Sequence, residues 1–137
     1  SGTTGHPKGA VLTQAALQWN AINSLHMHNM TSDDHVLTVL PLFHVGGLNI
    51  QTTPALHCGA TVTLLRRFHP EQTLSIIATD RPTLTVLVPT ILQACINAPT
   101  WAATDLSCLR AVTTGSTTVP PQLVDAFRAR GICVLEV

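Results

Sequence analysis

Short apolar runs alternate along the chain with longer stretches in which apolar residues recur every three or four positions. The runs are rich in β-branched residues. Most are apolar at both odd and even positions, as strands are when a parallel sheet buries both of their faces. We therefore predict five strands, at residues 36–40, 60–65, 83–88, 109–113 and 132–137.

The stretch before the first of these strands has the pattern of an amphipathic helix. Thr13 is a candidate N-cap for it, because a hydroxyl there can accept a hydrogen bond from the first turn. The helical spacing predicts an inward face made of Ala16, Trp19, Ile22 and Leu25.

Three further helices are expected to begin at prolines, which suit the first helical position. The first runs from Pro70 to about Thr79 and the second from Pro89 to Ala98, and the third starts at Pro120-Pro121 with Gly131 as its C′ residue. Residues 45–57 are also expected to be helical. Strands that alternate with helices imply right-handed βαβ crossovers. The predicted fold class is α/β, a single unit with a mostly parallel sheet and flanking helices.

Charge is scarce in this chain of 137 residues. Seven Lys and Arg balance seven Asp and Glu, only 10% of residues are charged and 45% are hydrophobic, against roughly 25% charged in an average domain. This excludes a disordered segment and gives no basic excess for a nucleic acid. No apolar run reaches the ~20 residues of a transmembrane helix. The sequence starts inside a Gly/Thr loop and ends inside an apolar run. Together with the low charge, this leads us to expect that residues 1–137 are part of one larger domain, truncated at both ends.

The four cysteines show no paired spacing. They stand at positions 58, 95, 108 and 133, with no C-x-x-C pair, so neither a metal site nor a disulfide framework is predicted. We expect reduced thiols in a cytoplasmic protein.

The chain opens on a loop of glycines and hydroxyls that contains its only lysine. The loop reads Ser1-Gly2-Thr3-Thr4-Gly5-His6-Pro7-Lys8-Gly9. Glycines let the backbone turn its N–H groups toward an anion, and the lysine adds one positive charge. The P-loop pattern G-x-x-x-x-G-K-[S/T] does not fit, because Gly9 stands where a Ser or Thr would bind magnesium. Taken alone, the composition fits either a phosphate loop or an exposed turn.

Two later segments follow predicted strands, where ligands of open α/β sheets bind. The first is Leu40-Pro41-Leu42-Phe43-His44-Val45-Gly46-Gly47, in which His44 is either a functional or a structural histidine. The second is residues 112–120, whose Gly115-Ser116-Thr117 turn would bind a polar ligand or cap the next helix. A hydrolase elbow, G-x-S-x-G, is excluded because Thr118 replaces its second glycine.

These three segments, in this order, resemble the adenylate-forming superfamily of acyl-CoA synthetases, peptide-synthetase adenylation domains and luciferases. Residues 1–9 match its phosphate loop, [S/T]-S-G-[S/T]-T-G-x-P-K-G, from the second position on. The segment around His44 is similar to its P-[L/F]-[F/Y]-H-x-x-G motif, and residues 114–119 are similar to its [S/T]-G-G-A-x-[L/V] motif. Ser116 departs from that last pattern, since the superfamily has a glycine there.

The resemblance implies a role for each segment. Thr3, Thr4, Gly5 and Lys8, with Ser1 and Gly2 beside them, would hold the ATP phosphates while pyrophosphate leaves. His44 would lie near the reacting carboxylate, with Val45, Gly46 and Gly47 shaping the acyl pocket, and Gly115, Ser116 and Thr117 would lie along the adenine. His44 and Lys8 are thus the expected catalytic residues.

The resemblance further implies an ATP-dependent acyl-CoA ligase, which uses ATP, Mg²⁺ and coenzyme A on a small carboxylate. The segment from Phe43 to Gly47 favours a fatty acid or similar carboxylate. A peptide-synthetase adenylation domain and an aryl acid–CoA ligase are the alternatives within the superfamily, and a non-catalytic nucleotide-binding module is the alternative outside its chemistry. The Mg²⁺ ligands are expected mostly beyond this chain, with no metal ligand assigned within it, and the chain alone is expected to be inactive and to need the remainder of its polypeptide.

Overall fold

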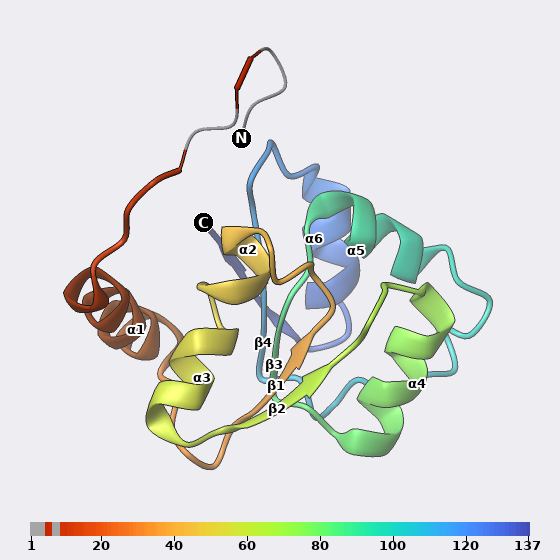
Figure 1. The fold of residues 1–137 in the computed structure, drawn as a ribbon. Helices are drawn as coiled ribbons and strands as arrows, with labels where there is room; N and C mark the ends of the chain where they lie inside the picture. Colours follow the sequence, from red (N-terminus) through yellow and green to blue (C-terminus); the bar gives the residue numbers. More distant parts are fainter. Residues whose placement is uncertain (1–4, 7–8) are drawn as a thin grey trace.

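The structure, a computed structural model, describes residues 5–6 and 9–137. Helices and strands alternate along the chain, except that two helices, α2 and α3, lie between β1 and β2 (Figure 1). In chain order they are α1 (Gln14–His28), β1 (His35–Thr38), α2 (Val45–Leu48), α3 (Thr52–Cys58), β2 (Thr61–Leu64), α4 (Pro70–Asp80), β3 (Leu84–Val86), α5 (Pro89–Ile96), β4 (Ala111–Thr114), α6 (Pro121–Arg128) and β5 (Cys133–Glu136). The five predicted strands are confirmed, with shorter bounds. The α/β class is confirmed with them.

All five strands are parallel and lie in the order β2-β1-β3-β4-β5. The register places Thr63, Leu37, Thr85, Val112 and Val134 in one row across the sheet. Residues of one row point to the same face, because neighbouring strands of a sheet are pleated in step. The sheet therefore presents two distinct sets of side chains to the helices on its two sides.

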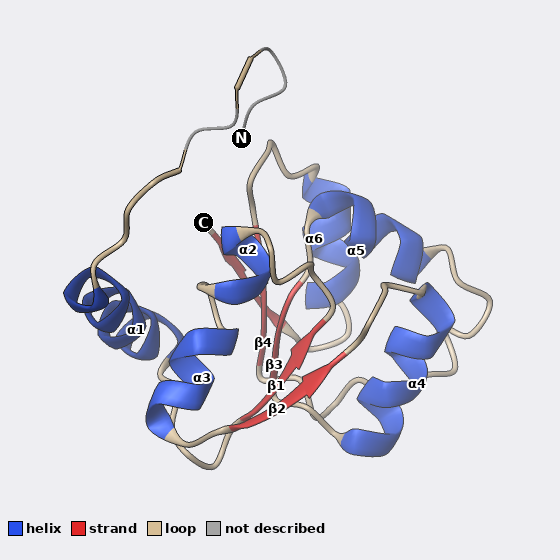
Figure 2. Ribbon diagram, in the orientation of Figure 1, coloured by secondary structure: helices blue, strands red, loops and turns tan. Residues whose placement is uncertain are grey.

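Helices cover both faces of the sheet (Figure 2). On one face α4, α5 and α6 bury a large apolar core. Its fully buried members include Leu37, Leu74, Ile77, Leu87, Leu92, Val112 and Phe127. On the other face α1 and α3 pack over a smaller core of Met30, Val36, Ala55, Ala60, Leu84 and Ala111. The edge strand β2 is only partly covered: its residues are exposed or intermediate.

Two expectations about the helices are confirmed only in part. In α1 Leu25 packs against the smaller core and Ile22 is partly buried, as predicted, whereas Ala16 is exposed and Trp19 is 64% exposed. The fully buried residues of α1 are Ala21, Ser24 and His28, so its inner face includes two polar side chains, for a reason given below. Residues 45–57 form two helices rather than one, because the chain turns between Leu48 and Thr52. No helix in the described ranges is long and apolar enough to cross a membrane.

An ion pair fastens the amino ends of three strands, at the edge of the sheet opposite the predicted ligand loops. The buried Asp34 carboxylate accepts hydrogen bonds from Arg110 Nη2 at 2.9 Å, from the Thr31 N–H at 2.9 Å and from the Thr83 hydroxyl at 2.6 Å. Arg110 also donates to the His28 carbonyl at 2.7 Å. Burial raises the pKa of Asp34, but these hydrogen bonds and the Arg110 charge outweigh it, so the pKa lies below its ordinary value.

Candidate functional site

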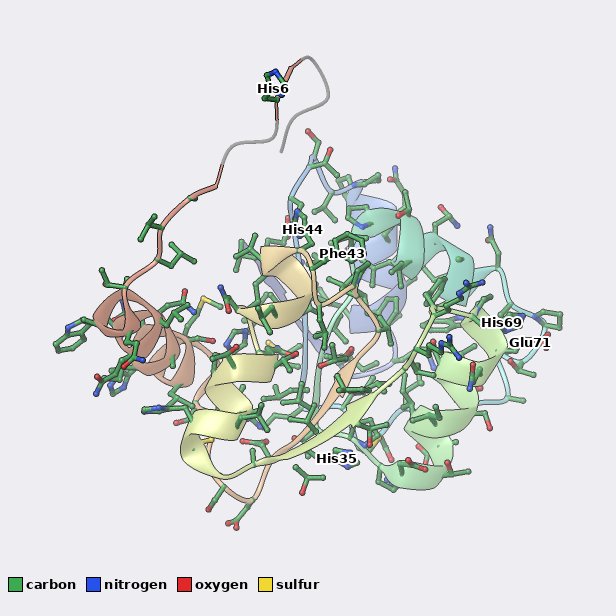
Figure 3. All side chains as sticks on the ribbon, in the orientation of Figure 1. His6, His35, Phe43, His44, His69 and Glu71 are labelled. Carbon is green, nitrogen blue, oxygen red and sulfur yellow. The ribbon has the colours of Figure 1, made fainter. Side chains whose placement is uncertain are left out.

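The strand order creates a switch point between β1 and β3. The chain leaves β1 toward β2 on one side, and it leaves β3 toward β4 on the other, so the two connections diverge at the carboxyl ends of these strands. Open parallel sheets bind ligands in the crevice that this divergence opens, as in the flavodoxin-like order 2-1-3-4-5. The loop after β1 contains His44, and Figure 3 shows His44 and Phe43 at this end of the molecule and His35 at the other.

His44 is the N-cap of the short helix α2. Its Nδ1 accepts a hydrogen bond from the Gly46 N–H at 2.9 Å, and the ring is exposed. Because Nδ1 is the acceptor, a neutral ring carries its proton on Nε2. His44 is therefore held as an N–H donor at the switch point, which is the form that can bind a carboxylate or phosphate oxygen.

The two glycines after Val45 let α2 lie tightly against the loop that precedes it. A Cβ at position 47 would overlap the carbonyl oxygen of Pro41, and a Cβ at position 46 would lie 3.1 Å from His44 Nδ1. Both glycines are buried. Their small size therefore lets the histidine loop pack directly against α2.

Gly115 lies where β4 ends and the backbone of β5 comes close. The Val137 N–H donates to the Thr114 carbonyl at 2.9 Å, and a Cβ at position 115 would overlap the Val137 carbonyl oxygen. Ser116 follows in the left-handed region at φ 70° and is exposed. Glycine adopts the left-handed conformation at lower cost than serine because it has no Cβ. The backbone at position 116 therefore explains why the superfamily has a glycine there.

Changing Ser116 to Gly is expected to raise the free energy of unfolding by up to about 1 kcal/mol. A non-glycine residue in the left-handed region destabilises the native state by ~1–2 kcal/mol. Glycine removes this strain, but its greater conformational entropy in the unfolded chain offsets ~0.5–1 kcal/mol of the gain. Urea denaturation measures the difference. The matched control is Thr117→Gly in the same exposed turn, which has no positive φ to relieve and should be destabilising. Equal effects of the two changes would contradict the assigned strain.

A buried chain of polar side chains runs beneath these loops, and the sequence analysis missed it. The Gln51 amide donates to Thr113 Oγ1 at 3.2 Å, and Thr113 Oγ1 lies 2.9 Å from His28 Nε2. His28 Nδ1 lies 2.9 Å from the Ser24 carbonyl, which can only accept, so Nδ1 carries the proton and Nε2 accepts from Thr113. This chain is why the buried face of α1 is polar. Gln51 Oε1 and the Thr114 hydroxyl are also buried, without a hydrogen-bond partner among the described residues.

The native protein is expected to lose stability as the pH falls below about 6.5. Burial lowers the pKa of His28, helped by the Arg110 charge and opposed by the hydrogen bond to Ser24. Below its ordinary pKa, His28 therefore binds a proton more readily in the unfolded chain than in the native state. Its contribution to the free energy of unfolding is complete above that pKa and declines as the pH falls below it. The slope approaches about 1.4 kcal/mol per pH unit between the unfolded and folded pKa values.

Urea denaturation between pH 7.5 and 5 checks this expectation. His28→Gln should remove this part of the pH dependence, whereas His26→Gln, on the exposed side of the same helix, should retain it. An identical pH slope in wild type and His28→Gln would show that His28 is not the group responsible.

The structure brings some of the predicted site residues together and leaves others apart. Val45, at the start of α2, and Val137, beside Gly115, line one cavity, so the second and third predicted segments meet through the end of β5. The loops after β1 and β4 are separated by β3, which sets them about 10 Å apart at two strand spacings. Of the first segment, Ser1, Gly2, Thr3, Thr4 and Lys8 lie outside the described residues. Gly5 is exposed, and no other described segment comes within 4 Å of where its Cβ would be.

In residues 5–6 and 9–137 no three His, Cys, Asp or Glu side chains lie close enough together to hold a metal ion.

The fold is that of a doubly wound α/β domain, and its candidate ligand-binding edge lies at the carboxyl ends of β1, β3 and β4. The sequence matches the model of the AMP-binding enzyme family over residues 1–137. The chain belongs to this family, and the resemblance to adenylate-forming enzymes is confirmed.

Curated relatives of the chain are CoA ligases of aromatic acids. It is 54% identical over 137 residues to an indoleacetate–CoA ligase from Aromatoleum aromaticum, covering all of this chain and 27% of that protein. It is 40% identical over 136 residues to a feruloyl-CoA synthase from an Amycolatopsis species, covering 99% of this chain and 28% of that protein. The chain thus spans about a quarter of the length of the curated relatives it matches.

Solved structures repeat the fold closely. The N-terminal domain of FACL13 from Mycobacterium tuberculosis, in an inhibitor-bound crystal structure, superimposes with a TM-score of 0.88 at 31% identity, over 99% of this chain and 34% of that one. ATP-bound MatB from Rhodopseudomonas palustris gives a TM-score of 0.84 at 28% identity, over 99% of this chain and 27% of that one. The α/β architecture described above is therefore that of known acyl-CoA synthetase domains.

Proposed function

We propose that residues 1–137 form part of the adenylation domain of an ATP-dependent acid–CoA ligase that works in the cytoplasm. The single observation that carries this proposal is the position and state of His44, a fixed N–H donor at the switch point of a sheet in an AMP-binding enzyme chain. The four cysteines, all in the described part of the chain, are free thiols, which suits a reducing compartment.

The proposed reaction has two steps. A carboxylate oxygen attacks the α-phosphorus of ATP, so that an acyl–O–P bond forms and the bond to pyrophosphate breaks. The thiolate of coenzyme A then attacks the acyl carbon, a thioester forms, and AMP leaves with the oxygen that had joined the two. In the first step His44 Nε2–H would hold the carboxylate, and Lys8 with the hydroxyls and N–H groups of residues 1–5 would hold the phosphates. Such donors stabilise charge that develops on the leaving group. Mg²⁺ would neutralise phosphate charge when bound.

The proposed carboxylate is an aromatic acid rather than a fatty acid. The relatives named above act on indoleacetate and ferulate, so they favour the aryl acid ligase that the sequence left as an alternative. The backbone of Leu40 and Pro41 fills the space beside Gly47, and the side chains of His44 and Leu40 lie beside Gly46, so these glycines do not open room for a chain-like acyl group.

An acid panel tests this function on the intact protein. Acyl-CoA and AMP formation would be measured with ATP, Mg²⁺ and CoA and with phenylacetate, indole-3-acetate, ferulate, decanoate and phenylalanine in turn. We expect thioester formation with one or more of the aromatic acids. Preference for decanoate would restore the fatty-acid assignment, activation of phenylalanine alone would indicate a peptide-synthetase domain, and no turnover with any acid would indicate a non-catalytic module.

A further inference from the structure

Two polar links tie the turn after α2 to strands on either side of the switch point. On one side the Thr52 hydroxyl donates to the Gly47 carbonyl at 2.6 Å and accepts from the Thr38 hydroxyl of β1 at 2.7 Å. On the other side the Gln51 amide donates to Thr113 Oγ1 of β4 at 3.2 Å. Because β3 lies between β1 and β4, two consecutive residues of the turn bridge the switch point.

His28 completes the second of these links. The one hydroxyl proton of Thr113 goes to His28 Nε2 at 2.9 Å, so the lone pairs of Oγ1 are left to accept from Gln51. All three side chains are at most 2% exposed. Solvent therefore does not compete for these groups, and hydrogen bonds in such a buried chain strengthen one another. The link to Gln51 is thus held in a single direction and geometry.

The position of His44 depends on these links. The helix that it caps, α2, has only four residues, and a helix shorter than ~12 residues is marginal by itself in water. Tertiary contacts must therefore hold α2 in place, and the turn that follows it supplies them. At the far end of the second link, Thr113 is two residues before Gly115 in the chain. The Gln51–Thr113 bond therefore joins the element that carries the proposed carboxylate donor to the loop expected along the adenine.

We propose that Thr113 is a positioning residue, which sets the distance between His44 and the Gly115 loop. Its hydroxyl acts through Gln51, and His28 fixes the direction of the hydroxyl proton. The inference rests on the proposed function, in which a carboxylate held at His44 attacks a nucleotide held at the Gly115 loop. A misplacement of about 1 Å in such an approach can lower a rate ~100-fold. The proposal adds to that function a buried device that aligns the two substrates.

Thr113→Val tests the inference on the intact protein, because valine has nearly the shape of threonine and lacks the hydroxyl. In indole-3-acetate-dependent ATP–pyrophosphate exchange, kcat should fall at least 10-fold, while the KM values for ATP and for the acid change less than 3-fold. Thr113→Ser keeps the hydroxyl and should stay within 3-fold of wild type. Gln51→Leu breaks the same link from its other end and should reproduce the loss, so the test does not depend on the folding of one variant.

Thr85→Val is the matched control. Thr85 is fully buried in β3, and its hydroxyl donates to the Leu37 carbonyl at 2.8 Å, outside both links. The change removes a buried hydroxyl and its hydrogen bond while the link from Gln51 to Thr113 stays intact. Its kcat should therefore remain within 3-fold of wild type. Urea denaturation of both variants identifies the conditions in which each is folded, and kcat is compared there.

A stable mimic of the acyl adenylate, an indole-3-acetyl sulfamate ester of adenosine, gives a readout independent of turnover. Because the mimic spans both loops, calorimetry should show at least 10-fold weaker binding to Thr113→Val than to Thr85→Val. AMP alone and indole-3-acetate alone should bind the two variants within 3-fold of each other. An equal kcat or an equal affinity for the mimic in the two variants would overturn the inference and leave the proposed function standing. A wild type that neither exchanges pyrophosphate nor binds the mimic would overturn the proposed function, and the inference with it.

Discussion

Replacing Lys8 by alanine in the intact protein is expected to lower aromatic-acid-dependent ATP–pyrophosphate exchange about 10- to 100-fold. The loss corresponds to about 1.4–2.8 kcal/mol of transition-state stabilisation, the scale of one hydrogen bond to a charged group. Lys8 is the only lysine of the chain and stands in the segment that resembles a phosphate loop. A point charge at this position would stabilise the pyrophosphate as it leaves.

The control for this change is Arg66→Ala. It removes one positive charge from an exposed side chain that follows β2, at the carboxyl edge of the sheet and outside residues 1–9. Exchange should remain within 2-fold of wild type. If Lys8→Ala and Arg66→Ala were equally active, the phosphate-binding assignment of residues 1–9 would be wrong.

Replacing Asp34 by alanine is expected to lower the free energy of unfolding by about 2–4 kcal/mol, the largest stability effect predicted here. The Asp34 carboxylate is 7% exposed and accepts hydrogen bonds from Thr31, Thr83 and Arg110. Its loss leaves the Thr31 N–H and the Thr83 hydroxyl without this acceptor and frees a guanidinium whose side chain is 40% exposed. Removing one partner of a fully buried pair costs ~3–5 kcal/mol, and the exposure of Arg110 reduces that figure.

Asp105 offers the matched control for Asp34. It pairs with Arg81, but both side chains are about half exposed, at 59% and 46%. Water and salt screen such a pair, so Asp105→Ala should change stability little. Urea denaturation of the two variants, side by side at pH 7, measures the difference. A loss from Asp105→Ala as large as that from Asp34→Ala would show that the buried network does not fasten the strands.

The elements of the fold could be predicted because their signals are local. Prolines mark the starts of α4, α5 and α6, and β-branched runs mark the strands. The inward face of α1 could not be predicted in this way. Its partners, Gln51 on the chain after α2 and Thr113 in β4, are distant in sequence, and only the parallel sheet brings them to His28.

The candidate site was predictable in position and less so in detail. His44 and Gly115 follow strands, and strand ends are where such sheets bind ligands. The sequence does not reveal that His44 caps α2 through Nδ1, because that requires the turn between β1 and α2. Nor does it reveal the cavity that α1 and Ile50 line beside this loop. These features arise from packing between segments and leave no local pattern.

The transfer of oxygen from the carboxylate to AMP tests the central claim most directly. Intact protein would be incubated with ATP, Mg²⁺, CoA and indole-3-acetate labelled with ¹⁸O at both carboxylate oxygens, and the AMP analysed by mass spectrometry. Adenylation at the carboxyl edge of this sheet predicts one ¹⁸O in each AMP formed, with much less AMP from His44→Ala than from a control at the exposed His57. Thioester formed together with unlabelled AMP, or with the ¹⁸O in inorganic phosphate and release of ADP, would contradict it.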